Sequence, residues 1–215
     1  MTNSGVGVEP AEETRRRVRA RHPRLRDALP ADALIAVKYR GEAQEFSSRL
    51  DVALTIARLA IVSDAFLAQI FYRIKARLQR LGIPILPRIA HRLAIALGQV
   101  SIGDPVVVAP GLYLPHGQVV LDGRVEVGES VSIAPFVTVG LLAGNLQGPV
   151  IEPGVLIGTG AKILGSVRIG AGAQIGANAV VLSDVPPGTT AVGAPARPPR
   201  RSEAVSRPRA SDSVL

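Results

Sequence analysis

The chain has 215 residues, no cysteine, 3% aromatic residues and a formal net charge of +8. The absence of cysteine excludes disulfides, cysteine-ligated metals and a cysteine nucleophile. The positive charge lies in the first 98 residues, which hold 17 Lys and Arg against 9 Asp and Glu.

Residues 1–20 are expected to form a flexible basic arm. Residues 15–26 hold seven arginines without an interleaved aromatic residue, which favours a solvated segment over a specific nucleic-acid site. The polar start has no apolar stretch of the kind found in secretory signals, and we therefore expect a cytoplasmic protein.

Residues 21–98 are expected to form an α-helical region. The spacing of apolar residues predicts a helix over 66–81, ended by Gly82 and Pro84, and a second helix over 86–97. The apolar run 52–62 contains Arg58 and is too short to span a membrane. We expect the apolar stripe of the first helix to pack on the rest of the protein or on a partner subunit; contact with a membrane surface is the alternative.

A six-residue repeat runs through residues 99–197. Large aliphatic residues stand at every sixth position and small apolar residues four positions later: Ile151, Ile157, Ile163, Ile169, Ile175 and Val181, then Val155, Ala161, Val167, Ala173, Ala179 and Val185. This period fits neither a helix nor a simple strand, and is typical of short strands joined by tight corners. Three hexads would form one triangular coil, so the pattern predicts a mainly β, parallel β-helix domain. The Pro-, Arg- and Ser-rich residues 198–215 are expected to be disordered.

Two irregularities interrupt the repeat. The step from Leu114 to Leu121 is seven residues and contains His116, whereas residues 141–149 lack the pattern and predict an excursion loop. A histidine lifted off the prism wall suits general-base chemistry, because imidazole titrates near neutral pH. His22 and His91 are expected to be structural or solvent-facing.

The hexads, the segment 157–165 and the ending Val-Pro-Pro-Gly-Thr-Thr-Ala-Val-Gly-Ala-Pro-Ala-Arg (185–197) resemble those of the hexapeptide acyltransferases. The serine O-acetyltransferase branch is the most similar, over about residues 60–197. The resemblance implies a left-handed β-helix, a homotrimer or dimer of trimers with active sites between prisms, acetyl-CoA as acyl donor and no metal.

The resemblance also implies roles for individual residues. His116 takes the place of the catalytic base, and backbone N–H groups near Gly140 would stabilise the oxyanion. The pantetheine arm would lie along Gly158, Thr159, Ala161 and Lys162, and Lys162 and Arg197 would meet the CoA phosphates.

Three positions depart from the family pattern. Pro115 replaces an aspartate before the catalytic histidine, Gly148 replaces a second histidine, and Ser101 replaces the aspartate that orients the imidazole, for which the nearby Asp104 is a substitute candidate. Serine is the expected acceptor, a sugar hydroxyl is the runner-up, and a non-catalytic scaffold is the alternative of another class. A zinc-type carbonic anhydrase on a related fold needs three histidines, and the repeat contains only His116.

Overall fold

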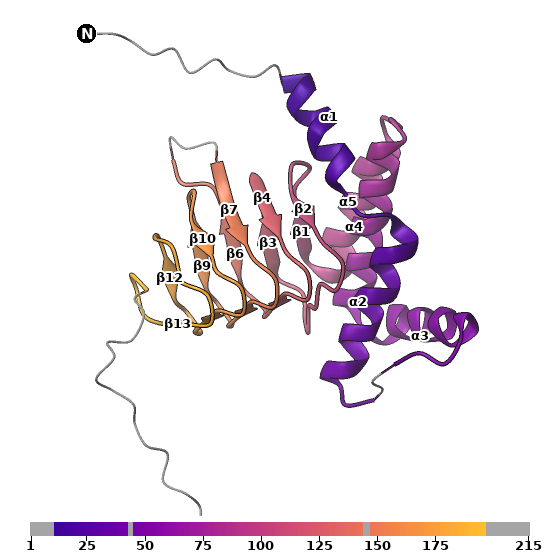
Figure 1. Cartoon of the computed structure of the whole chain (residues 1–215). Coiled ribbons are helices and arrows are strands. Elements are labelled where there is room, and N and C mark those ends of the chain that lie inside the picture. The colour runs from indigo at the N-terminus through magenta and orange to yellow at the C-terminus, as the bar shows by residue number, and fades with distance from the viewer. Residues whose placement is uncertain (1–10, 43–44, 144–146, 197–215) are drawn as a thin grey trace, which may run out of the picture.

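Five helices gather at one end of a stack of short strands (Figure 1). The computed structural model describes residues 11–42, 45–143 and 147–196. The helices are α1 (Ala11–Arg21), α2 (Leu25–Tyr39), α3 (Arg49–Val62), α4 (Asp64–Arg80) and α5 (Leu86–Gly98). The strands are β1 (Val100–Ile102), β2 (Val107–Val108), β3 (Val119–Leu121), β4 (Arg124–Val127), β5 (Ser132–Ile133), β6 (Thr138–Gly140), β7 (Gln147–Ile151), β8 (Leu156–Ile157), β9 (Lys162–Leu164), β10 (Arg168–Ile169), β11 (Gln174–Ile175), β12 (Val180–Val181) and β13 (Thr190–Ala191).

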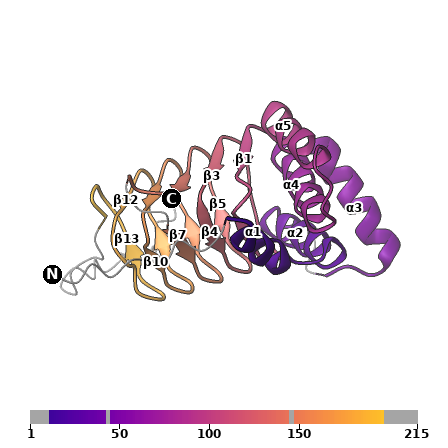
Figure 2. The same cartoon turned by 90° about the horizontal axis from the view of Figure 1, so that it is seen from above.

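The strands wind through three sheets in turn. The first sheet has the order β1-β3-β6-β9-β12, the second β10-β7-β4-β2 and the third β13-β11-β8-β5. Every pairing between these strands is parallel, and each joins a strand to the strand one coil away. The view from above shows the coils as a row of stacked loops beside the helices (Figure 2). The predicted parallel β-helix is therefore confirmed.

The repeat predicts the core of the β-helix. Ile151, Ile163 and Ile169, at the first hexad position, are at most 1% exposed, and the fifth-position Ala161 and Ala173 are fully buried. Large and small side chains therefore fill the narrow prism together, and this core is continuous from the first coil to the last.

The N-terminal segment differs from the expected arm. Residues 11–21 form α1, whose sequence lacks Gly and Pro. The Arg21 guanidinium pairs with the Glu126 carboxylate on β4, with Nη2 and Oε2 2.6 Å apart. This ion pair ties α1 to the β-helix, a contact between distant residues that composition alone cannot reveal. The remainder of the arm (1–10) and the tail (198–215) lie outside the described residues.

The polar residues Gln69, Tyr72, Arg73 and Lys75 of α4, here called the polar ridge, cover the first coil of the β-helix. Arg73 donates to the carbonyls of Val108 and Ala109 at 2.6 and 2.8 Å, and Lys75 to that of Gly103 at 3.1 Å. Gln69 and Tyr72 donate to the carbonyls of Leu112 and Val106 at 3.1 and 3.2 Å, respectively. An end coil has no further strand to pair with, and the polar ridge supplies the missing donors.

This capping role explains why two basic residues of α4 are buried. Arg73 is 3% exposed and Lys75 is 1% exposed. Asp32 of α2 neutralises Arg73 through contacts of 2.8 and 2.9 Å and also accepts hydrogen bonds from the amides of Gly111 and Leu112, both at 2.9 Å. Asp32 therefore joins α2, α4 and the first coil at one point.

His22, between α1 and α2, is 4% exposed, and neither ring nitrogen has a hydrogen-bond partner among the described residues. Burial, together with the positive charges of Lys75 and Arg73, lowers the pKa of this imidazole from 6.5 to about 4. His22 is therefore neutral in the folded protein, whereas the unfolded chain takes up its proton below about pH 6.5.

Stability is expected to depend on pH through His22. The contribution of the neutral imidazole is fully present above pH 6.5 and is lost as the pH falls to about 4, by about 3 kcal/mol in total. Urea unfolding at pH 7.5 and pH 4.5 checks this for the native chain and His22→Gln. The native chain should lose more stability than the variant; equal losses would show that His22 does not titrate in this way.

Among the described helices, none is both long and apolar enough to cross a membrane. Part of the apolar stripe of α4 packs within the protein: Phe66 is 2% exposed and contacts the cluster formed by α2 and α3, while Phe71 packs against the core of the β-helix. The expected packing of this stripe on the rest of the chain is therefore observed for these residues, whereas Leu81 at its end is 62% exposed.

Candidate functional site

The extra residue of the seven-residue step lies at a corner between the third and first sheets. Ile133 donates a backbone hydrogen bond to Tyr113, and Val120 donates one to Val137 in the next coil. Between these points the first coil has four corner residues (115–118), and the next coil has three (134–136). The surplus residue projects this corner outward, and the His116 side chain is exposed there.

The end of α5 fixes the position of this corner. The amides of Gln118 and Val119 donate to the carbonyl of Gln99, at 2.8 and 3.3 Å. Gly117 lies against the same helix end, where an added Cβ would stand 2.0 Å from the carbonyl oxygen of Gly98. Only glycine fits at this position, and it holds the backbone next to His116 against α5.

With His116 in its expected role as the base, Gly117→Ala should lower kcat/KM of the expected acetyl transfer about 100-fold. The corner must move away from α5, and this movement carries His116 out of position. Steady-state kinetics with a parallel thermal melt check this. Gly172→Ala serves as the control, since its added Cβ would meet no atom within 4 Å; its left-handed φ (+66°), which Gly117 does not share, adds backbone strain without a close contact. Unchanged activity in Gly117→Ala would show that the contact with Gly98 does not position the histidine.

The same corner repeats down the β-helix as a column of residues with left-handed φ. Its members are Gln118 (63°), Phe136 (64°), Gly160 (76°) and Asn178 (56°). Phe136 is unusual in this column, because bulky aromatic residues rarely adopt a left-handed φ. Phe136 is also 53% exposed, one coil from His116. The hexads predict a corner here, but the sequence does not distinguish Phe136 as a surface residue of the site.

Comparisons with known proteins find relatives of this sequence and this fold. Residues 148–183 match the bacterial transferase hexapeptide (six repeats) family. The serine acetyltransferase of Helicobacter pylori is 37% identical over 134 residues, which make up 60% of this chain and 78% of that protein. A probable serine acetyltransferase of rice (Oryza sativa) is 40% identical over 182 residues, or 83% of this chain and 56% of that protein.

The chain belongs to the serine acetyltransferase family. Among solved structures, the serine acetyltransferase of Neisseria gonorrhoeae in complex with serine superimposes with a TM-score of 0.70 at 31% identity, covering 86% of this chain and 73% of that one. Soybean serine acetyltransferase complexed with serine gives 0.69 at 34% identity, covering 83% and 71%. These structures confirm the left-handed β-helix preceded by a helical region.

The residues that the family resemblance assigns to the cofactor do not all face outward. Thr159 is exposed at the column of left-handed corners, and Lys162 is half-buried beside it. Gly158 packs so closely on the next coil that an added Cβ would lie 2.7 Å from the amide nitrogen of Ala177. Ala161 is fully buried in the prism, and its carbonyl accepts a hydrogen bond from the amide of Thr138. Its side chain therefore belongs to the core.

Lys162 already has partners within the chain. Its ammonium donates to the carbonyl of Phe136 at 2.6 Å and to the hydroxyl of Thr138 at 3.2 Å. These bonds place its positive charge at the corner column beside Phe136, one coil from His116. They also hold the backbone of Phe136 in its left-handed conformation.

Gly140 lies at the C-terminal end of β6 in the first sheet and the excursion loop follows it, whereas the His116 corner lies at the N-terminal ends of these strands. Gly140 is buried at the end of β6, and its carbonyl accepts from the amide of Gly165 at 3.0 Å. Three residues (137–139) separate it from Phe136, and the four steps along the chain span roughly 13 Å in an extended strand. The structure therefore does not bring Gly140 and His116 together within one chain. Residues 144–146 of the loop and Arg197 lie outside the described residues.

Gly148 and Ser101, which depart from the family pattern, and Asp104, the substitute candidate, do not lie in the surroundings that the pattern leads us to expect. Gly148, assigned to the loop, is buried in β7, where an added Cβ would meet the carbonyl oxygen of Arg124 at 2.7 Å. Asp104 pairs with the ammonium of Lys75 at 3.3 Å. Ser101 lies in β1 opposite Val120. Among the described residues, no hydrogen bond or ion pair joins Asp104 or Ser101 to His116, so the structure assigns neither as its orienting partner.

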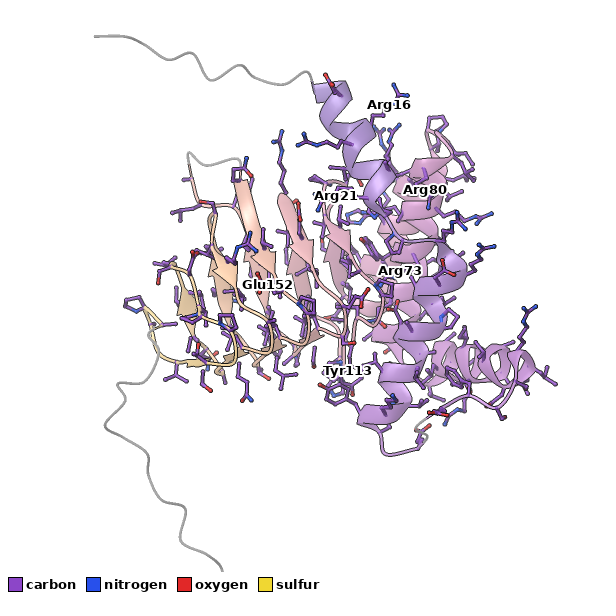
Figure 3. The ribbon with its side chains drawn as sticks, in the orientation of Figure 1. Arg16, Arg21, Arg73, Arg80, Tyr113 and Glu152 are labelled. Atoms are coloured by element: carbon purple, nitrogen blue, oxygen red, sulfur yellow. The ribbon has the colours of Figure 1, made fainter. Side chains whose placement is uncertain are left out.

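The described residues contain no group of three or more His, Asp or Glu side chains placed to hold a metal ion. Tyr113, three residues before His116, stacks on Tyr39 of α2 with ring centroids 4.4 Å apart and planes 2° from parallel. Figure 3 shows Tyr113 at the foot of the first coil, beside the helices. This stack fixes the chain that leads into the histidine corner.

Proposed function

We propose that this protein transfers the acetyl group of acetyl-CoA directly to the hydroxyl of L-serine, with His116 as general base. The observation that carries the proposal is the exposed histidine at the projected corner of the first coil, in a chain of the serine acetyltransferase family. Imidazole at this corner can accept the hydroxyl proton as the oxygen attacks the thioester carbon. The carbon–sulfur bond then breaks, and the proton passes to the departing CoA thiolate.

The donor would lie along the corner column, past Phe136, Thr159 and Lys162. The exposed ring of Phe136 offers an apolar wall to the pantetheine arm, and the ammonium of Lys162 offers charge to a phosphate. Arg197 is the second candidate for the phosphates. Direct transfer needs no nucleophile on the protein, which agrees with a sequence that contains no cysteine.

The active site would be completed by a neighbouring subunit of a homotrimer. Gly140 lies at the C-terminal end of β6, and His116 lies at the N-terminal ends of the strands of the first sheet. The backbone N–H groups near Gly140 would therefore serve the histidine of an adjacent prism. This separation supports a site between subunits over a site within one chain. A dimer of such trimers is the larger assembly to test, by light scattering of the purified protein.

Thiol release from acetyl-CoA, followed with a chromogenic disulfide, tests the proposal. The sequence contains no cysteine, so the protein contributes no background. Release is expected with L-serine. Release only with members of a sugar panel would identify a sugar O-acetyltransferase, which the replacements Pro115, Gly148 and Ser101 would then explain. No release with any acceptor and no CoA binding would leave a scaffold protein.

A further inference from the structure

A cleft of about 350 Å³ lies between the start of α2 and the end of α4. Four arginines line it, and no acidic residue does: Arg24, Arg26, Arg77 and Arg80, with Pro23, Leu25 and Leu81 as apolar walls. We call it the arginine cleft. Figure 3 places Arg80 among the helices, whereas His116 belongs to a corner of the β-helix.

Arg24 and Arg77 of the cleft lack the carboxylate partners that arginines have elsewhere among the described residues. Arg58 and Arg168 pair with Glu42 and Glu152, and Arg73 pairs with Asp32. Within ranges 11–42, 45–143 and 147–196, by contrast, the guanidinium groups of Arg24 and Arg77 make no hydrogen bond or ion pair.

The other two cleft arginines have weak partners. Arg80 donates to the carbonyl of His22 at 3.3 Å, and Arg26 meets the exposed Asp27 at 3.6 Å. The four guanidinium groups therefore keep most of their donors and nearly all of their charge available to a ligand.

The backbone adds to this positive potential. α2 begins at the cleft with Arg24 as its N-cap, and no side chain caps the first amides of this 15-residue helix. Free N–H groups at a helix start favour an anion. Arg80 of the cleft also contributes, after burial, Lys75 and Arg73, to the lowered pKa of the adjacent His22.

We propose that the arginine cleft binds a small phosphorylated or sulfated molecule. Guanidinium groups present paired donors that match a tetrahedral oxyanion, and several together suit a ligand with more than one negative charge. The apolar walls at Leu25 and Leu81 suit an organic group beside the anion. This site is separate from Lys162, the candidate for the CoA phosphates, and does not rest on the proposed acetyl transfer.

Isothermal titration of the full chain with inorganic pyrophosphate, and then with ADP, tests the proposal. The native protein should bind both probes, with ADP tighter because its organic part meets the apolar walls. The double variant Arg24→Gln/Arg77→Gln should bind pyrophosphate at least about 10-fold more weakly, since each lost guanidinium removes charge-assisted hydrogen bonds.

Two control variants distinguish this site from other sources of binding. Arg92→Gln removes an exposed arginine of α5 outside the cleft, and Lys162→Gln removes the donor-site candidate; each should change pyrophosphate affinity less than about twofold. The double variant should unfold at the same temperature as the native protein, since the side chains of Arg24 and Arg77 have no hydrogen-bond or ion-pair partners among the described residues. No binding by the native chain, an equal loss in Arg92→Gln, or a loss in Lys162→Gln with none in the double variant would each overturn the proposal. Binding of an RNA fragment in place of both probes would also overturn it, because the cleft would then be part of a general polyanion surface.

Discussion

Replacing His116 with alanine is expected to lower kcat/KM for acetyl transfer by about 10²–10⁴-fold, the usual contribution of a positioned general base. The fold should be unaffected, because the His116 side chain is exposed and makes no hydrogen bond or ion pair with the described residues. Its thermal unfolding should match that of the native protein, since exposed substitutions typically change stability by about 0.5 kcal/mol or less.

The pH dependence of this loss separates a base from a merely structural residue. The native protein should show a rising limb of kcat/KM that reports the free-enzyme base, and His116→Ala should lose that limb. His91→Gln, a change at the half-buried histidine of α5, serves as the matched control and should retain both rate and pH profile. Full activity in His116→Ala would remove the histidine from the mechanism.

Asp32→Ala is expected to destabilise the protein by about 3–5 kcal/mol, because it leaves the guanidinium of Arg73 buried without its counter-charge. The variant also loses the acceptor for the amides of Gly111 and Leu112. Urea unfolding followed by circular dichroism measures the loss. Asp27→Ala on the same helix is the control, since Asp27 is exposed and should change stability by well under 1 kcal/mol.

A paired replacement tests the origin of this loss. Asp32→Leu combined with Arg73→Met removes both charges, so part of the stability lost in Asp32→Ala should return. Recovery should be incomplete, because the carbonyls of Val108 and Ala109 lose their donor. If Asp32→Ala unfolds at the native urea concentration, the ion pair does not hold the helices to the first coil.

The β-helix could be predicted from sequence because its core repeats with a fixed period. Ile163 and Ala161 are buried because the first and fifth positions of each hexad point into the prism. The projected corner at His116 follows from the one extra residue in the seven-residue step. The helices α4 and α5 could be predicted as well, since the spacing of apolar residues indicates both and Gly82 with Pro84 ends the first.

The contacts between the helical region and the β-helix could not be predicted. Arg73 and Lys75 have the charge of surface residues, and only the unpaired carbonyls of the first coil explain their burial. Position 117 likewise could not be predicted to require glycine, because that requirement comes from the close approach of the Gly98 carbonyl at the end of α5. Such residues are fixed by close approach in space, for which one sequence carries no periodic signal.

The polar ridge gives the β-helix a direction of growth. The helices precede the repeats in the chain, so a ribosome completes the surface formed by Gln69, Tyr72, Arg73 and Lys75 before it makes the first coil. That surface offers hydrogen-bond donors to the carbonyls of the emerging coil, and each finished coil then presents an edge to the next. Synthesis from the N-terminus would thus extend the stack from a template that is already in place, and strands would meet their native neighbours before later ones exist.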